Sequence, residues 1–174
     1  KDSLPLEDEP SDSIKDLISQ FELYGKLTGD KLRAAELIKY TQETLSMIDS
    51  LQDKLSKKKP VRYYFAQGVD GLYSECRGSF HLEPFSYSGA KNALDCDMSS
   101  NYGMEKMSME NILMADPDVI VAMEPLFVKN IKQNPHFKNL RAVKNNKVYL
   151  VPSTPFNYIS RPPSFMRLMG IRWL

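Results

Sequence analysis

Three residues near the middle of the sequence combine a positive charge, a hydroxyl group and an imidazole. Arg77, Ser79 and His81 follow residues 61–66, a β-branched and aromatic run typical of a buried strand. Ligands of open α/β sheets lie outside the carboxyl ends of strands, and the amide groups of a helix beginning at Ser79 attract negative charge. The three residues therefore indicate a place for an anionic group. The alternative is a solvated loop in which His81 caps a helix or packs.

The two cysteines, Cys76 and Cys96, are too few for a disulfide scaffold and lack Cys-x-x-Cys spacing. We expect two unpaired or incidentally buried thiols, with a disulfide between them as the alternative. His81 and His136 are the only histidines, so a zinc site built from protein ligands alone is not expected.

The composition is that of an ordinary globular protein. The 174 residues are 42% hydrophobic and 26% charged, with a formal net charge of +1, enough for one domain with an appendage. This balance gives no electrostatic reason to expect nucleic acid as a partner, because the lysines at 57–59 are explained as a helix end. No apolar run is long enough to cross a bilayer, and the first residues lack the basic start and apolar centre of a secretion signal.

The longest predicted element is a helix over residues 30–57 that contains neither glycine nor proline. Asp30 caps its start, Pro60 lies beyond its end, and the lysines suit the carbonyl end of the helix dipole. At about 1.5 Å per residue it would be roughly 40 Å long, enough to cross from one lobe to another. A shorter helix, capped by residues 11–13 and closed by residues 25–29, either packs on the long helix or belongs to a largely missing lobe. Residues 1–10 read as an acidic linker or tail.

After Pro60, short apolar strands alternate with helices. We predict strands at 61–66, 92–94, 119–123 and 147–151, and helices at 79–89, 109–115, 126–133 and 162–170, with a polar loop over 67–78. Continuous apolarity along the strands indicates a mainly parallel sheet covered on both faces. The predicted fold class is therefore α/β, a three-layer lobe preceded by a long helix. The apolar end at 171–174 indicates truncation, which we infer for both ends.

Several segments, taken in order, resemble one known family. They are residues 61–66, 78–83 (GSFHLE), 89–92 (GAKN), 107–113 (MSMENIL), 116–121 (DPDVIV), 140–149 (LRAVKNNKVY), 161–164 (RPPS), 168–170 (LMG) and 173–174 (WL). Their order and spacing are similar to the carboxyl-terminal lobe of class III periplasmic substrate-binding proteins. These are the receptors of ABC importers for iron-siderophores, haem, cobalamin and related metal complexes. Ala90 departs from the pattern, because many relatives have a second glycine there.

The resemblance implies two α/β lobes joined by one long helix, with the ligand in the shallow cleft between them. Residues 1–29 would be the remnant of the amino-terminal lobe, 30–59 the interlobe helix, and 60–174 the carboxyl-terminal substrate-binding lobe. Most of the amino-terminal lobe would then be missing from this chain.

The resemblance also implies that Arg77, Ser79, His81, Tyr158 and Arg161 bind the ligand. His81 lies near the position where some catecholate-siderophore receptors supply a histidine to iron left open by the chelator, and Tyr158 would be its phenolate counterpart. Both would contact metal only through a bound ferric complex. Arg161 would meet carboxylate or catecholate charge. The alternative is a proline-flanked loop that holds Tyr158 by packing.

Glu83 has a different implied role. Family members dock each lobe on the membrane permease through a surface acid, and Glu83 is the acid of the helix that would carry it. Relatives often have an acid one turn later, where this chain has Ser86. The alternative is an exposed, solvated glutamate.

Three hypotheses for the function follow. The first is an extracytoplasmic receptor that captures an iron complex, siderophore-like or haem-like, and delivers it to an importer permease, with no intrinsic cofactor. It would lie in the periplasm or on the extracellular face of the cytoplasmic membrane, with a lipid anchor as an option. The second is an oxyanion receptor of the same family, such as one for molybdate or tungstate, for which Arg77, His81 and the helix start at Ser79 would suffice without Tyr158. The third is an α/β enzyme domain that carries a metal cluster. We expect no enzyme, because the sequence lacks an activated nucleophile, a carboxylate pair and a set of cluster cysteines.

Overall fold

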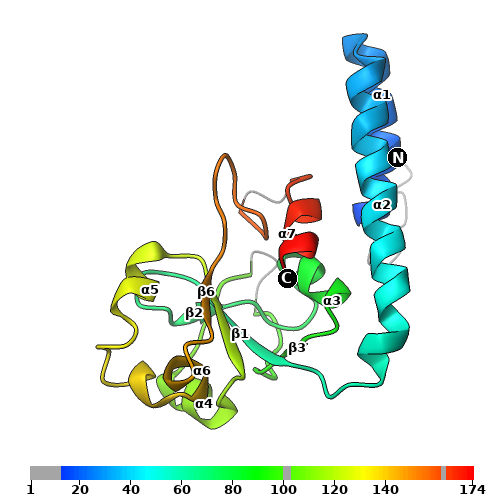
Figure 1. Ribbon diagram of the computed structural model, residues 1–174. Helices are drawn as coiled ribbons and strands as arrows, with labels where there is room; N and C mark the ends of the chain where they lie inside the picture. Colours follow the sequence, from blue (N-terminus) through cyan, green and yellow to red (C-terminus); the bar gives the residue numbers. More distant parts are fainter. Residues whose placement is uncertain (1–12, 100–102, 162–163) are drawn as a thin grey trace, which may run out of the picture. The chain divides into compact units, whose positions relative to one another are not determined.

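The computed structural model describes residues 13–99, 103–161 and 164–174 (Figure 1). The chain divides into two compact units, of which the first ends at Met47 and the second begins at Ile48. The boundary falls inside one continuous helix, α2 (Lys31–Ser56), which agrees closely with the helix predicted over residues 30–57.

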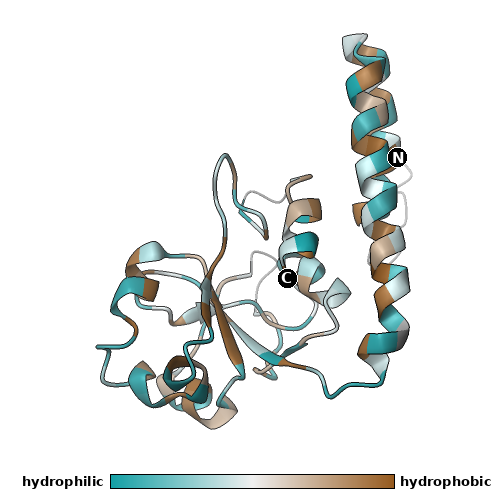
Figure 2. Cartoon of the chain, viewed as in Figure 1, coloured by the Kyte–Doolittle hydropathy of each residue, from teal (hydrophilic) through white to brown (hydrophobic). Residues whose placement is uncertain are grey.

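The first unit contains α1 (Ser13–Thr28) and the beginning of α2. Asp30 caps α2, since its carboxylate accepts the Arg33 amide at 3.0 Å. A side-chain carbon added at Gly25 would lie 2.5 Å from Ala34 Cβ, so the two helices pack directly on each other. Figure 2 shows hydrophobic and hydrophilic residues alternating along α2, as expected for a helix with one buried face. The first helix is therefore one arm of a hairpin, one of the two predicted alternatives.

The second unit is built on a four-stranded sheet in the order β3-β1-β5-β6, with all neighbouring strands parallel. The strands are β1 (Arg62–Ala66), β3 (Lys91–Asn92), β5 (Val119–Ala122) and β6 (Val148–Leu150). β5 pairs with β1 over the whole length of β5, from Tyr63 opposite Val119 to Ala66 opposite Ala122. Their carboxyl ends consequently meet at one edge of the sheet.

Helices cover both faces of this sheet (Figure 1). On one face, Tyr64, Ile120 and Ala122 pack with residues of α4 (Met109–Ala115), α5 (Pro125–Asn130), the short helix η2 (Phe137–Asn139) and α6 (Arg141–Lys144). On the other face, Tyr63, Phe65 and Val121 pack with α3 (Glu83–Tyr87) and with Trp173 of α7 (Arg167–Trp173). The predicted three-layer α/β fold is confirmed.

The connection between β1 and β3 differs from the prediction. Residues 67–78, expected to be a loop, contain β2 (Tyr73–Ser74), which pairs antiparallel with β4 (Glu105–Lys106). The single helix expected over 79–89 is instead a 3₁₀ turn, η1 (Phe80–Leu82), followed by α3. Pro84 explains the break, because proline is favoured at the start of a helix and cannot supply an amide to a preceding turn. The helix expected over 162–170 is observed as α7 (Arg167–Trp173), because residues 164–166 form a bend and a turn; residues 162–163 lie outside the described residues.

The cysteines correct another expectation. Cys76 and Cys96 form a disulfide, so the preference for unpaired thiols is wrong. The Arg77 amide donates to the Cys96 carbonyl at 2.9 Å, which holds the segment after β2 beside the segment after β3. Sequence spacing alone could not show that these segments become neighbours. Within the described residues, no helix is both long enough and apolar enough to cross a membrane.

Candidate functional site

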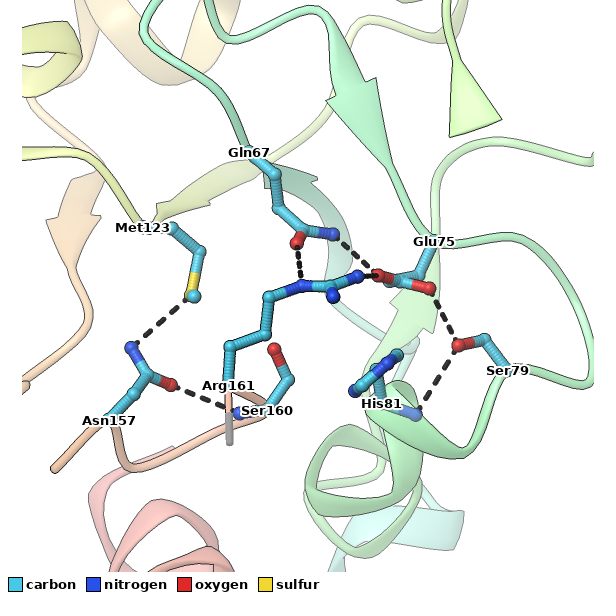
Figure 3. A network of polar contacts seen from close by, with 8 residues as sticks. All are labelled: Gln67, Glu75, Ser79, His81, Met123, Asn157, Ser160 and Arg161. Carbon is cyan, nitrogen blue, oxygen red and sulfur yellow. Dashed lines mark hydrogen bonds and ion pairs between the residues drawn. The ribbon is translucent and has the colours of Figure 1, made fainter. Parts of the chain in front are cut away.

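A group of polar side chains gathers where β1 and β5 end (Figure 3). Gln67 directly follows β1 and Met123 directly follows β5. The loop after β6 brings Asn157, Ser160 and Arg161 to the same edge, and the segment between β2 and α3 brings Glu75, Ser79 and His81. This is the edge at which open parallel sheets bind ligands.

Glu75 is at the centre of the group. Its side chain is fully buried, and its Oε1 atom accepts hydrogen bonds from Gln67 Nε2 at 2.8 Å and from Arg161 at 3.0 Å. Its Oε2 atom accepts from Ser79 Oγ at 2.7 Å. A carboxylate can be buried only where donors and an opposite charge compensate for lost hydration, and these three residues supply both.

Arg161 is held by two acceptors and remains partly open to solvent. Its Nε atom donates to Gln67 Oε1 at 3.1 Å and one terminal nitrogen donates to Glu75, while the side chain stays 36% exposed. A guanidinium has five N–H donors, so these two bonds leave three that have no partner among the described residues. Those donors form a planar edge suited to a pair of ligand oxygens.

Ser79 links this ion pair to His81. Its hydroxyl donates to Glu75 and accepts the His81 amide at 3.3 Å, which makes Ser79 the cap of η1. The Ser79 hydroxyl and the His81 amide are therefore already engaged. We predicted that a helix beginning at Ser79 would offer amide groups to an anion. The structure has only the three-residue turn η1 at this position.

The His81 side chain is buried, and its Nδ1 atom has no hydrogen-bond partner among the described residues. Burial is the largest effect on the pKa of His81 and lowers it, and the positive charge of Arg161 lowers it further. The negative charge of Glu75 and a hydrogen bond to the Ser160 backbone raise the pKa, but the net shift is downward. The ring is therefore neutral at neutral pH. A neutral imidazole has one N–H group and one nitrogen with a lone pair, and Nδ1 is the buried ring nitrogen without a partner among the described residues. His81 thus offers a nitrogen donor beside the Arg161 guanidinium.

The loop that carries Arg161 is fixed from within. The Asn157 carboxamide oxygen accepts the amides of Ile159 at 2.9 Å and Ser160 at 3.0 Å, and its nitrogen donates to Met123 Sδ at 3.3 Å. Tyr158 is partly buried and packs on the apolar cluster around Phe65 and Phe85. The structure therefore supports a packing role for Tyr158, and its contact with iron stays a prediction.

Arg77 is separated from this group. Its guanidinium forms ion pairs with Asp95 and, at 4.0 Å, with Asp97, and all three side chains are largely exposed, at 69%, 89% and 88%. The structure brings together Ser79, His81 and Arg161 of the predicted ligand-binding residues, and it does not bring Arg77 to them.

Glu83 begins α3 and forms an ion pair with Arg167 at the start of α7. The two side chains are only 14% and 11% exposed, so Glu83 is not the solvated glutamate of the alternative interpretation. Its role in permease docking stays a prediction.

The sequence interpretation missed Glu75, Gln67 and Asn157. Glu75 lies between Ser74 and Cys76, and nothing in this local sequence indicates that its carboxylate is buried. The one available signal is that it directly follows a short β-type run. Gln67 carried a clearer signal, because it is the first polar residue after the predicted strand at 61–66. Among the described residues, no group of three or more His, Cys, Asp or Glu side chains is placed to hold a metal ion.

Comparisons with known proteins show which sequences and folds the chain is similar to. The chain is 34% identical to an ABC transporter solute-binding protein from Sulfurospirillum deleyianum, with a TM-score of 0.80 over 94% of this chain and 50% of that one. It is 26% identical to the molybdate-bound binding protein MolA of Haemophilus influenzae, with a TM-score of 0.69 over 92% of this chain and 48% of that one. It is 27% identical to the high-affinity heme uptake system protein IsdE of Staphylococcus aureus, over 83% of this chain and 51% of IsdE.

The chain thus spans about half the length of the curated relatives it matches. The profile of the family described as "Periplasmic binding protein" matches residues 6–155. Proteins of this family bind solutes for transport and are not enzymes, which agrees with the expectation of a non-catalytic chain. The resemblance seen in the sequence is confirmed, and the chain belongs to the periplasmic binding protein family.

Proposed function

We propose that this chain is the carboxyl-terminal lobe and connecting helix of the solute-binding component of an ABC importer, and that this component carries an iron complex of the siderophore or haem type. Residues 1–29 would end an amino-terminal lobe, 30–59 would connect the lobes, and 60–174 would bind the ligand. The component would act in the periplasm or on the extracellular face of the cytoplasmic membrane, where a lipid anchor could hold it, and would deliver its cargo to the membrane permease.

The observation that carries this proposal is the convergence of Arg161 and His81 at the carboxyl ends of β1 and β5. The Arg161 side chain is partly exposed, and the buried Nδ1 atom of His81 has no partner among the residues that the structure describes. Oxygen-rich chelators match the first group, and iron with an open coordination site matches the second. Because Nδ1 is covered by protein atoms, coordination would require a local side-chain movement.

The distribution of charge favours a bulky complex over a small anion. The positive charge of Arg161 is paired with Glu75, and that of Arg77 is paired with Asp95 and Asp97. A small dianion needs uncompensated positive charge and donors on all sides. A chelate spreads its charge over several oxygens and can use the single open edge of Arg161.

Calorimetric titration of the full-length receptor tests the proposal. The probes are haemin, whose iron accepts axial ligands, and a ferric tris-hydroxamate, whose iron is saturated. We expect His81→Ala to weaken haemin binding by roughly tenfold or more and to leave the saturated chelate nearly unchanged. Equal loss for both probes would argue against direct coordination. Tyr158→Phe in the same titrations tests the predicted phenolate, and no change for haemin would remove it from the ligand set.

An oxyanion is the second candidate cargo, favoured by the likeness to the molybdate-bound MolA. In this case Arg77 would have to leave Asp95 and Asp97 to meet the anion. Titration with molybdate distinguishes the two candidates. Tight molybdate binding that is lost in Arg77→Ala and retained in Arg161→Ala would overturn the iron proposal.

Docking on the permease through Glu83 remains part of the proposal. The Glu83 carboxylate already pairs with Arg167, so a permease arginine would have to compete with that contact. In reconstituted importer, we expect Glu83→Gln to lower ligand-stimulated ATP hydrolysis without changing ligand affinity. Unchanged ATP hydrolysis would exclude this residue from docking.

A further inference from the structure

We propose that Glu75 sets the charge preference of the binding site: by neutralising Arg161 from behind, it makes the receptor select iron complexes of low net charge. This inference rests on the proposed function and adds the charge class of the cargo. Glu75 would not touch the ligand; it is a positioning residue that acts through Arg161.

The geometry separates the two roles of the Arg161 guanidinium. Its Nε atom and one terminal nitrogen face Gln67 and the buried Glu75, whereas the rest of the group belongs to a side chain that is 36% exposed. The inner edge therefore meets the negative charge, and the outer edge is left for the ligand (Figure 3). The outer edge keeps its hydrogen-bond donors, but the negative charge of Glu75 offsets much of the positive charge that a ligand there would meet.

The other charged groups near this edge do not change that balance. His81 is neutral at neutral pH, because burial lowers its pKa, and the nearby charge of Arg167 is paired with Glu83. Gln67 and Ser79 are uncharged. The site therefore combines one positive and one negative charge among the described residues. A ligand with several negative charges would lose hydration without gaining an uncompensated partner.

The arrangement is also closely constrained around Glu75. A side-chain carbon added at Gly103 would lie 2.1 Å from Glu75 Oε2, so the backbone of Gly103 passes directly against the carboxylate. Glycine leaves the room that the buried carboxylate needs. This close fit holds the negative charge at a fixed distance from Arg161, as a charge-setting role requires.

The test uses a series of ligands that differ in charge and share one iron centre. Ferrioxamine B is cationic through its free amine, the N-acetyl derivative is neutral and the N-succinyl derivative is anionic. Haemin and its dimethyl ester provide a second pair, with and without the propionate charges. Each is titrated into the full-length wild-type receptor and into Glu75→Gln, a substitution that keeps the shape and can still accept from Arg161.

We expect wild-type affinities to vary little along each series. In Glu75→Gln the ratio of affinities should shift toward the anionic member by about fivefold per unit of ligand charge, as a charge several ångströms away produces near a protein surface. The shift should shrink at high salt. Glu110→Gln, which removes an exposed carboxylate on α4, is the matched control and should leave the ratio unchanged.

A loss of affinity that is equal for every member of a series would show that Glu75 is only structural, and would overturn the inference. A wild-type receptor that already favours the anionic member by tenfold or more would also overturn it, even if Glu75→Gln failed to fold. In both of these cases the wild-type receptor still binds the iron complexes, so the proposed iron cargo would be retained. A wild type that binds neither series would remove the iron proposal and this inference with it.

Discussion

Arg161 and Arg77 are both paired with carboxylates, yet their surroundings are opposite. Glu75, the partner of Arg161, is fully buried, and Gln67 and Ser79 complete its hydrogen bonds. The partners of Arg77, Asp95 and Asp97, are almost fully exposed. The first arginine is held by a partner that cannot turn to water, and the second can exchange its partners for water at little cost. Burial of the carboxylate therefore decides which arginine has a fixed position.

The largest difference between the two regions should appear in stability. We expect Arg161→Ala to lower the free energy of unfolding by about 3 kcal/mol, because it leaves the Glu75 carboxylate buried without an opposite charge. Arg77→Ala should lower it by less than about 1 kcal/mol. Urea unfolding of the 174-residue chain, followed by circular dichroism, measures both. Equal losses would mean that burial does not separate the two arginines.

The disulfide lies between the two regions, since Cys76 stands between Glu75 and Arg77 in the chain. It closes a loop with a sequence separation of 20 to Cys96. We expect the Cys76→Ser, Cys96→Ser double variant to lose about 3 kcal/mol in the same unfolding measurement. Repeating the measurement on the wild type after reduction provides the control, and it should reproduce the loss. Full stability after reduction would show that packing alone holds the segment.

Gly103 allows the buried carboxylate to be disturbed without changing any charge. Gly103→Ala should cost about 2 kcal/mol, since the added methyl group meets Glu75 and the residue has a φ of +67°. Gly29→Ala is the matched control, with a φ of +78° and nothing within 4 Å of the added carbon. It should cost about 1 kcal/mol from backbone strain alone. If the two losses were equal, the fit around Glu75 would be looser than described.

The smallest expected effect concerns pH. Burial lowers the pKa of His81 below the ordinary value of 6.5, so the unfolded state binds this proton at a higher pH than the folded state does. The stabilising contribution of the neutral, buried His81 is complete above about pH 6.5, the pKa of the unfolded state. It is lost as the pH falls from there toward the lower pKa of the folded state. His81→Gln should flatten the pH dependence of unfolding in this range.

The fold could be predicted because its signals are local. The apolar runs that became β1, β5 and β6 are continuous, and the helix over 109–115 was predicted with its boundaries unchanged. The position of the site at the strand ends follows from the parallel sheet. Ser79 and His81 were singled out there, and Arg161 was added through the family resemblance.

The partners of Arg161 could not be predicted in the same way. Glu75 lies 86 residues from Arg161, and only the folded chain shows that this carboxylate is buried. The same holds for the disulfide and for the pairing of β2 with β4, which depend on which loops become neighbours. The position of Arg77 in the sequence did not indicate that it would form ion pairs with Asp95 and Asp97. Whether Arg77, Tyr158 and Glu83 contact ligand or permease stays a prediction.

The Asn157 side chain has a consequence for the timing of recognition. Its hydrogen bonds to Ile159, Ser160 and Met123, with the Tyr158 amide bonded to the Pro152 carbonyl at 3.0 Å, order the segment that leads to Arg161 before any cargo arrives. The conformational entropy of that loop is therefore lost during folding and not during capture. A preordered loop needs no slow rearrangement to engage its cargo, so encounter can be fast and residence time is left to the contacts themselves. Under the proposed function, release of the cargo to the permease would then be adjusted through a few side chains while the rate of capture stays high.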